Sequence, residues 1–136
     1  MCCTCWWWPF GSVPEVPPRQ GLPFRNPTCQ LTPRRTLHTR DPATQVLDVR
    51  TRKEFRDGHI EGALPCSYLP PTSFRQRVAA LQLDPSRPVV AVCLSAHRSI
   101  AAVKLLRSMG FSDVVQLEGG MQAWRRERLP EVTTEP

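Results

Sequence analysis

A cysteine and an arginine with four residues between them form the strongest chemical signal in this 136-residue chain. They are Cys93 and Arg98, and Ser99 follows directly. A cysteine thiolate is a nucleophile, and a guanidinium is a planar cation that pairs with the oxygens of an oxyanion. An isolated cysteine is most often a small buried apolar residue. Because Arg98 and Ser99 stand beside it, we interpret Cys93 as a reactive nucleophile.

The residues on either side of this segment predict the two elements that hold it. Residues 88–92 are apolar and rich in β-branched side chains, which favours a strand buried on both faces. Residues 99–109 predict a helix whose polar side chains form one narrow stripe, namely Lys104, Arg107 and Ser108. Apolar residues cover the rest of that helix, so we expect them, Ile100 included, to be mostly buried.

The loop between this strand and this helix predicts an anion site. Backbone amides of a tight loop and the positive end of a helix favour an anion, including a thiolate. We therefore expect Cys93 to be the catalytic residue. The residues expected to bind substrate belong to the loop and the helix start: Leu94, Ser95, Ala96, His97, Arg98 and Ser99. Alanine at position 96 costs little conformational free energy if its φ is negative, and about 1 kcal/mol or more if its φ is positive.

Two further blocks accompany the cysteine loop. One is Leu47-Asp48-Val49-Arg50 with residues 54–63, and the other is Leu117-Glu118-Gly119-Gly120 before Trp124. With the loop, they resemble the rhodanese (thiosulfate sulfurtransferase) superfamily over about residues 31–130. Many members carry glycine where this chain has Ala96. The expected fold is α/β, a three-layer α/β/α domain with a central, mostly parallel sheet, and the alternation of strands and helices points the same way.

The resemblance implies sulfur transfer through Cys93. The thiolate attacks the outer sulfur of thiosulfate or a similar small anionic donor, sulfite leaves, and a cysteine persulfide remains. Cyanide, a thiol or a protein partner then accepts the sulfur. This cycle implies no metal and no organic cofactor. Asp48 and Arg50 match the aspartate and arginine that brace the loop in the family, so we expect them to be supporting residues, and the resemblance makes His59 structural.

Two other functions remain open at this stage. Phosphatases of the related cell-division-cycle family also use a cysteine–arginine cradle, but with five residues between the two. This chain has four, which predicts a loop too tight for a tetrahedral phosphate. Members of the superfamily that lack the cysteine act as docking modules, and a persulfide carrier loaded by another protein is an intermediate case. The presence of Cys93 and Arg98 argues against a purely structural module.

Short elements complete the expected domain. We expect strands over residues 45–49, 63–66 and 114–117, and a helix over residues 121–128. Residues 70–83 predict an amphipathic helix, and Ser73 with Gln76 predicts a capping box at its start. Cys66 is expected to fill a packed strand position, whereas an exposed Cys66 near Cys93 would permit a disulfide.

Length and charge restrict the class of protein. The chain is long enough for one domain, expected over residues 31–130, with a disordered or non-native extension over 1–30 and a tail over 131–136. The formal net charge is +6, without a basic run interleaved with aromatic residues, so no nucleic-acid partner is implied. No apolar run reaches the ~20 residues of a membrane helix, and no signal peptide is recognised. We therefore expect a reduced, cytoplasmic protein without membrane association.

Overall fold

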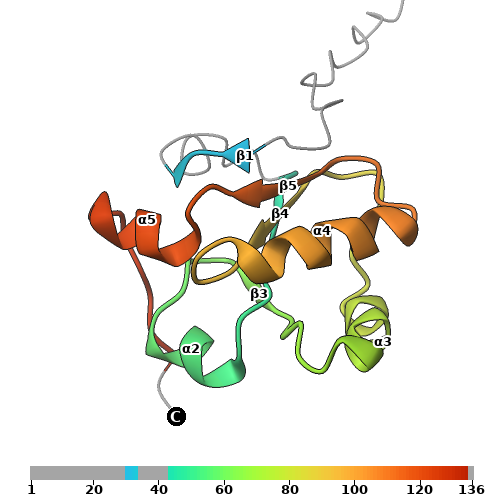
Figure 1. Cartoon of the computed structure of the whole chain (residues 1–136), viewed down its shortest axis with the longest axis horizontal. Coiled ribbons are helices and arrows are strands. Elements are labelled where there is room, and N and C mark those ends of the chain that lie inside the picture. Colours follow the sequence, from blue (N-terminus) through green and yellow to red (C-terminus); the bar gives the residue numbers. More distant parts are fainter. Residues whose placement is uncertain (1–29, 34–42, 135–136) are drawn as a thin grey trace, which may run out of the picture.

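The structure of the protein is a computed structural model that describes residues 30–33 and 43–134 (Figure 1). Of the extension expected over residues 1–30, only Gln30 is among the described residues, and it belongs to a strand. The elements in chain order are β1 (Gln30–Leu31), β2 (Gln45–Asp48), α2 (Arg52–Asp57), β3 (Leu64–Pro65), η1 (Pro71–Ser73), α3 (Phe74–Ala80), β4 (Val89–Val92), α4 (His97–Ser108), β5 (Val114–Leu117) and α5 (Gly120–Arg126).

The strands form one five-stranded sheet in the order β1-β5-β4-β2-β3. Every pair of neighbouring strands is parallel, and Leu47 of β2 pairs with Ala91 of β4. Because parallel strands end at the same edge, the carboxyl ends of β2, β4 and β5 bring the segments after Asp48, Val92 and Leu117 together. The three blocks singled out in the sequence therefore meet at one edge of the sheet.

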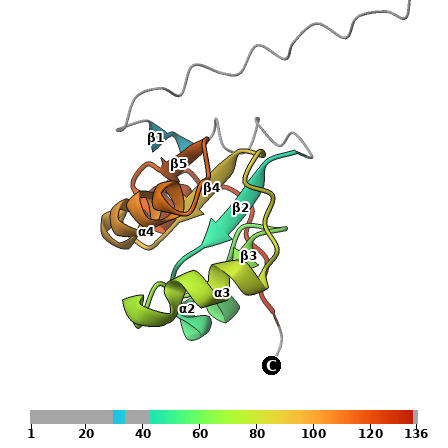
Figure 2. The same cartoon turned by 90° about the vertical axis from the view of Figure 1, so that its right-hand side faces the viewer.

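Successive residues of β4 face opposite sides of the sheet, which explains its wholly apolar sequence. One face packs against α3 and α4 in a cluster that includes Leu47, Val89, Ala91, Phe74, Val78, Ala102 and Leu106. The other face packs against α2 and α5 in a cluster that includes Val90, Val92, Val115, Phe55, Met121 and Trp124. The fold is thus the expected α/β/α sandwich around a parallel sheet. Figure 2 shows α2 and α3 at the end toward which the arrow of β2 points.

Two expectations about the helices are wrong. Ile100 is 46% exposed, because it lies four and eight residues before Lys104 and Ser108 and so shares their solvent-facing side of α4. The capping box at Ser73 does not form, because the Ser73 hydroxyl donates to Pro70 O and accepts from Arg77 instead. The predicted helix over residues 70–83 is shorter as well, since a 3-10 turn precedes α3.

α4 spans 12 residues and is the longest helix in the part of the chain that the structure describes. It begins at His97, two residues before the predicted start, and ends at Ser108. Gly110 follows with a φ of +99°, the left-handed conformation typical of a residue after a helix. None of the helices within residues 30–33 and 43–134 combines the length and apolar character needed to cross a bilayer.

The segment after α5 packs back onto the region after α2. Val132 and His59 exchange two backbone hydrogen bonds of 2.9 Å. His59 is buried, its ring stacks on Phe55 with centroids 3.8 Å apart, and its Nδ1 lies 2.8 Å from Phe55 O. Arg125 forms an ion pair with Glu131 beside this contact. His59 therefore fixes the turn after α2 and the chain beyond α5.

Candidate active site

Cys93 directly follows β4 and is 1% exposed. Its Sγ lies 3.5 Å from Oγ of Ser99, a buried residue on the first turn of α4. The Ser99 hydroxyl also lies 2.9 Å from Ala96 O and 3.0 Å from the side-chain oxygen of Gln116 on β5. A hydroxyl has one hydrogen and two acceptor positions. The Ser99 hydroxyl can therefore donate to a Cys93 thiolate once its hydrogen turns away from Ala96 O and the Gln116 oxygen. The cysteine is thereby connected to both α4 and β5.

The loop from Cys93 to α4 carries a set of backbone amides that have no acceptor among the described residues. Within the described chain, the amides of residues 94–99 donate to no backbone or side-chain acceptor. Free amides at the start of a 12-residue helix are suited to a negative charge, and the helix dipole adds to this preference. Ala96 has φ +72° and ψ −7°, which is the left-handed backbone conformation. Of the two expectations for alanine, the one for positive φ therefore applies, and Ala96 is strained.

The start of α5 anchors the other side of the loop. The amide of Met121 donates to Cys93 O over 2.8 Å, and the amide of Gln122 donates to Leu94 O over 3.0 Å. Gly120 makes this approach possible, because a Cβ on it would clash with both carbonyl oxygens. Its φ of +57° is also left-handed. The glycine pair before Trp124 thus shapes the backbone beneath the cysteine.

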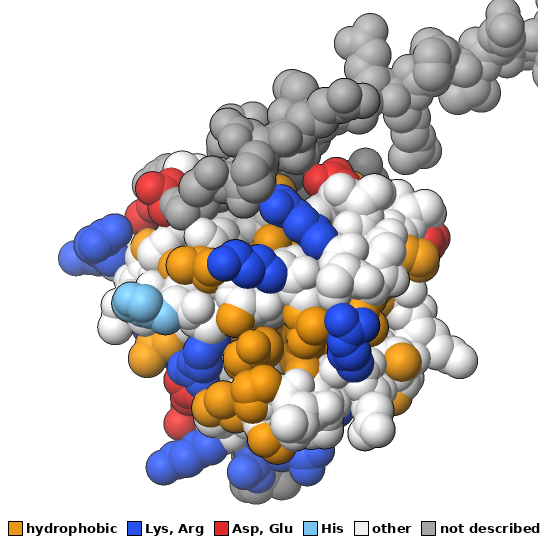
Figure 3. Space-filling view, turned by 45° about the vertical axis from the view of Figure 1, so that its right-hand side comes forward, with side chains coloured by type: hydrophobic (Ala, Val, Ile, Leu, Met, Phe, Trp, Pro, Cys, Tyr) orange, Lys and Arg blue, Asp and Glu red, His pale blue; other side chains and the backbone are white. Residues whose placement is uncertain are grey.

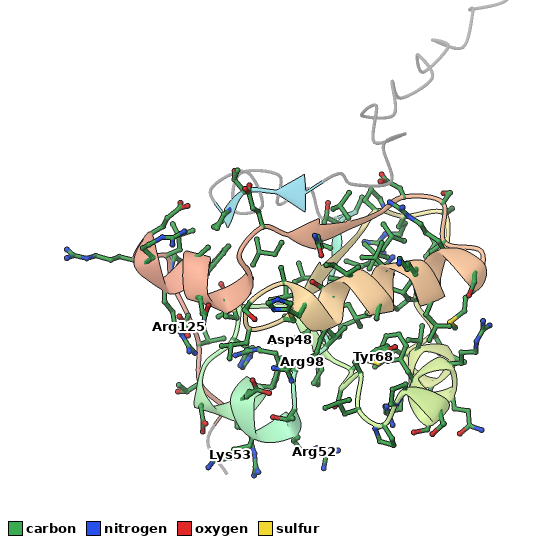
Figure 4. The ribbon with its side chains drawn as sticks, in the orientation of Figure 1. Asp48, Arg52, Lys53, Tyr68, Arg98 and Arg125 are labelled. Atoms are coloured by element: carbon green, nitrogen blue, oxygen red, sulfur yellow. The ribbon has the colours of Figure 1, made fainter. Side chains whose placement is uncertain are left out.

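Arg98 is held by a carboxylate that sequence reasoning did not single out. Its guanidinium donates to both oxygens of Glu54 on α2, over 3.0 and 2.8 Å, and both side chains are 27% exposed. This bidentate pair lowers the pKa of Glu54 to about 2. The pKa of Arg98 is raised, first by Glu54 and to a lesser extent by the negative charges of Cys93 and Asp48. Figure 4 shows Arg98 and Asp48 between the start of α4 and α2.

Glu54 is placed by the start of its own helix. The Thr51 backbone amide and hydroxyl donate to Glu54 Oε2 over 2.9 and 2.7 Å, and the Glu54 amide donates to Thr51 Oγ1. This is a capping box, and the spacing of Thr51 and Glu54 in the sequence was the signal that could have found it. The box fixes the carboxylate that in turn fixes Arg98.

Asp48 and Arg50 form a buried ion pair at the end of β2. Arg50 Nη2 lies 2.6 Å from Asp48 Oδ2, and both side chains are 1% exposed. The Arg50 amide and Nε also donate to the same carboxylate. The guanidinium then reaches Gly58 O over 2.8 Å. The pair therefore connects the strand end beside Cys93 to the turn that closes α2.

Comparison with known proteins identifies the family. A model described as "Rhodanese-like domain" matches residues 35–127, which is most of the chain. The chain belongs to the rhodanese-like family. A thiosulfate sulfurtransferase of Pseudomonas aeruginosa, GlpE, is 33% identical over 96 residues, which cover 71% of this chain and 83% of that protein. At the level of the family, the similarity supports sulfurtransferase chemistry, with a sulfur donor and a sulfur acceptor as substrates.

Solved structures of other rhodanese-like proteins agree with the fold. The crystal structure of the Alr3790 protein from Anabaena is 31% identical, with a TM-score of 0.67, and covers 78% of this chain and 94% of that chain. The polysulfide-sulfur transferase homodimer from Wolinella succinogenes is 30% identical, with a TM-score of 0.65 over 80% of this chain and 81% of that chain.

The remaining predicted residues of this rhodanese-like loop lie around Cys93 in different ways. Leu94 is half-buried against the cluster beneath α5. Ser95 Oγ lies 3.0 Å from His97 Nδ1, and this exposed pair has no hydrogen bond to Cys93. Cys66 is a buried free thiol whose pKa is raised by burial. Within the described residues, no group of three or more His, Cys, Asp or Glu side chains could hold a metal ion.

Proposed function

We propose that this rhodanese-like protein transfers a sulfane sulfur through a persulfide on Cys93. The observation that supports this function is the set of donors around the cysteine. The amides of residues 94–99 lack an acceptor in the described chain, and the Ser99 hydroxyl lies 3.5 Å from Sγ. Donors fixed before the reaction stabilise a developing negative charge without reorganisation.

The first half-reaction loads the cysteine. The Cys93 thiolate attacks the outer sulfur of thiosulfate and forms a new S–S bond. The original S–S bond of thiosulfate breaks, and sulfite leaves with the electron pair. The persulfide that remains on Cys93 carries a terminal anionic sulfur among the loop amides. The attacking form in this step is the thiolate, the nucleophilic form of a cysteine.

The second half-reaction unloads the cysteine. A thiolate or cyanide attacks the terminal sulfur, the bond between that sulfur and Sγ breaks, and the Cys93 thiolate is regenerated. The products are an acceptor persulfide or thiocyanate. The cycle uses neither a metal nor an organic cofactor. The acceptor is a thiol, cyanide or a partner protein.

The surrounding residues then have distinct roles. Substrate contacts come from the loop and the first turn of α4: Leu94, Ser95, Ala96, His97, Arg98 and Ser99. Arg98 supplies the cation nearest the departing oxyanion, and Glu54 limits its movement through the bidentate pair. Asp48 and Arg50 support the site by fixing the end of β2. Both described cysteines are free thiols, which suits a reducing compartment such as the cytoplasm.

Mass spectrometry of the protein after exposure to thiosulfate tests this function. We expect one added sulfur atom on Cys93, its loss on addition of cyanide, and no adduct in Cys93→Ser. Cys66→Ala is the matched control and should load normally, because Cys66 belongs to the core beneath the site. An adduct that persists at the same level in Cys93→Ser contradicts the proposal. Hydrolysis of an aryl phosphate without any sulfur loading would assign the cradle to phosphate chemistry instead.

A further inference from the structure

A cavity lined by arginines lies beside the site described above and shares Arg50 with it. It has a volume of about 500 Å³ and lies between α2, the segment after β3 and Thr134. Its lining includes four arginines and two apolar residues, namely Arg50, Arg52, Arg56, Arg77, Phe55 and Pro65. Among the described residues, no carboxylate belongs to the lining. A concave space with several cations and an apolar wall is suited to an organic anion.

Two of the four arginines form rigid walls. Arg77 donates to Ser67 O, Ser73 Oγ and Pro70 O, over 3.0, 2.6 and 2.9 Å. Arg50 is held by Asp48 and Gly58 O. Because their donors are engaged, these side chains define the shape of the cavity and contribute positive charge without moving.

The other two arginines are available to a ligand. Arg52 and Arg56 lie four residues apart on α2, are exposed, and form no hydrogen bond or ion pair with another described side chain. Two like charges at this spacing destabilise a helix, so the fold itself gains nothing from them. Figure 4 shows Arg52 projecting from α2 on the side toward α3. Two adjacent free guanidinium groups can each bind a carboxylate through two parallel hydrogen bonds.

The cavity and Cys93 lie along the same edge of the sheet. It lies at the carboxyl ends of β2 and β3, and Cys93 follows β4, the neighbour of β2 on the other side. Neighbouring strands are about 4.8 Å apart, so the ends of β3 and β4 are separated by about 10 Å. α2 borders both places, because its Glu54 binds Arg98 and its Arg52 and Arg56 line the cavity. A ligand that reaches from the cavity to Cys93 has to span about 10 Å, the distance between these strand ends.

We propose that Arg52 and Arg56 bind the carboxylates of a small thiol that accepts the sulfur from Cys93. This proposal rests on the sulfur transfer proposed above. A volume of about 500 Å³ is that of a small-molecule site, which favours a low-molecular-weight thiol over an acidic protein segment. The net charge of the chain is +6, and Figure 3 shows Lys and Arg side chains around a patch of hydrophobic side chains. Both features favour the approach of an anionic thiol. The acceptor thiolate attacks the terminal sulfur, and the Cys93 thiolate leaves.

Single-turnover unloading of the persulfide tests the site. The probes are mercaptosuccinate, a thiol with two carboxylates, and 2-mercaptoethanol, a neutral thiol. In Arg52→Gln/Arg56→Gln, the ratio of the mercaptosuccinate rate to the 2-mercaptoethanol rate should fall about tenfold, the effect of losing one net favourable ionic contact. The matched control is Arg126→Gln, an exposed arginine on α5 outside the cavity, which should keep the ratio. A ratio that is the same in both variants overturns the proposal.

A binding measurement separates this proposal from the proposed function. Succinate carries no thiol, so its binding to the unloaded full-length chain does not depend on persulfide chemistry. Calorimetry should detect succinate binding that the double variant loses and Arg126→Gln keeps. Absence of this binding, or equal binding by both variants, rejects the site even if Cys93 carries sulfur. An acidic cysteine peptide that is unloaded faster than mercaptosuccinate, with the same arginine dependence, would overturn the small-molecule assignment in favour of a protein.

Discussion

At the scale of single residues, Ala96 shows that the loop around Cys93 is held in a conformation its sequence disfavours. The φ of +72° is natural for glycine and strained for alanine. We predict that Ala96→Gly raises the free energy of unfolding by about 1 kcal/mol, measured by urea denaturation. Ala101→Gly, in the middle of α4, is the matched control and should lower it by about 1 kcal/mol. Destabilisation by both glycines would show that residue 96 is not strained.

Glu54 predicts a pH dependence of stability. Its pKa in the folded protein is about 2, below the ordinary value of 4.5, mainly because Arg98 binds the carboxylate. A lowered folded-state pKa means that the stabilisation is complete above pH 4.5 and is lost as the pH falls toward 2. Glu54→Gln should destabilise the protein by about 1 kcal/mol at neutral pH and flatten the acid decline of the unfolding free energy.

Glu118→Gln is the control for this pH prediction, since Glu118 is an exposed carboxylate on the turn before α5. It should reproduce the acid decline of the unchanged protein. If Glu54→Gln shows the same decline as Glu118→Gln, another carboxylate is responsible for the acid sensitivity.

The sequence predicted the positions of single residues relative to strands and helices better than it predicted contacts between distant residues. The spacing of Cys93 and Ser99 correctly indicated a cysteine beside the start of a helix. Glu54 and Gln116 were missed, because their contacts with Arg98 and Ser99 join elements that only the folded sheet brings together. The capping box at Thr51 was a readable local signal for Glu54, and a glutamine inside the apolar run of β5 was a weaker one for Gln116.

At the scale of elements, the contact between the cysteine loop and α5 depends on Gly120. We predict that Gly120→Ala lowers the free energy of unfolding by about 3 kcal/mol, through backbone strain and a clash with the carbonyl oxygens of Cys93 and Leu94. Gly62→Ala is the matched control, because Gly62 has a φ of +76° and a Cβ added there would meet no described atom within 4 Å. It should cost only about 1 kcal/mol. Equal losses of stability would show that the close contact does not limit position 120.

Elements with a strong apolar pattern were predicted to within one or two residues, and weaker ones were not. β4 and β5 are buried on both faces, so their apolar runs identify them directly. β1 was missed, since two residues carry no period and only pairing with β5 makes them a strand. Ile100 was assigned to the core by residue type, whereas its position on α4 relative to Lys104 indicates the exposed side.

At the scale of the whole molecule, the buried pair of Asp48 and Arg50 connects the sheet to α2. Removing one charge leaves the other buried without compensation, so we predict that Asp48→Asn or Arg50→Met costs about 3 kcal/mol or more. That is a large part of the about 5–15 kcal/mol by which a domain is stable. The double change Asp48→Asn/Arg50→Met should cost less than the sum of the single changes. Urea denaturation of the three variants measures this, and strict additivity would show that the two side chains act independently.

The two outermost strands of the described sheet also restrict how this molecule meets other chains. β1 and β3 are each two residues long, and β3 ends in Pro65, which has no backbone amide hydrogen. Such short edge strands are poor templates for the addition of a strand from a neighbouring chain. Intermolecular β-pairing, and the amyloid-like aggregation that can follow from it, is therefore disfavoured at both margins. If a protein partner exchanges sulfur with Cys93 as proposed, we expect it to contact side chains rather than to extend the sheet.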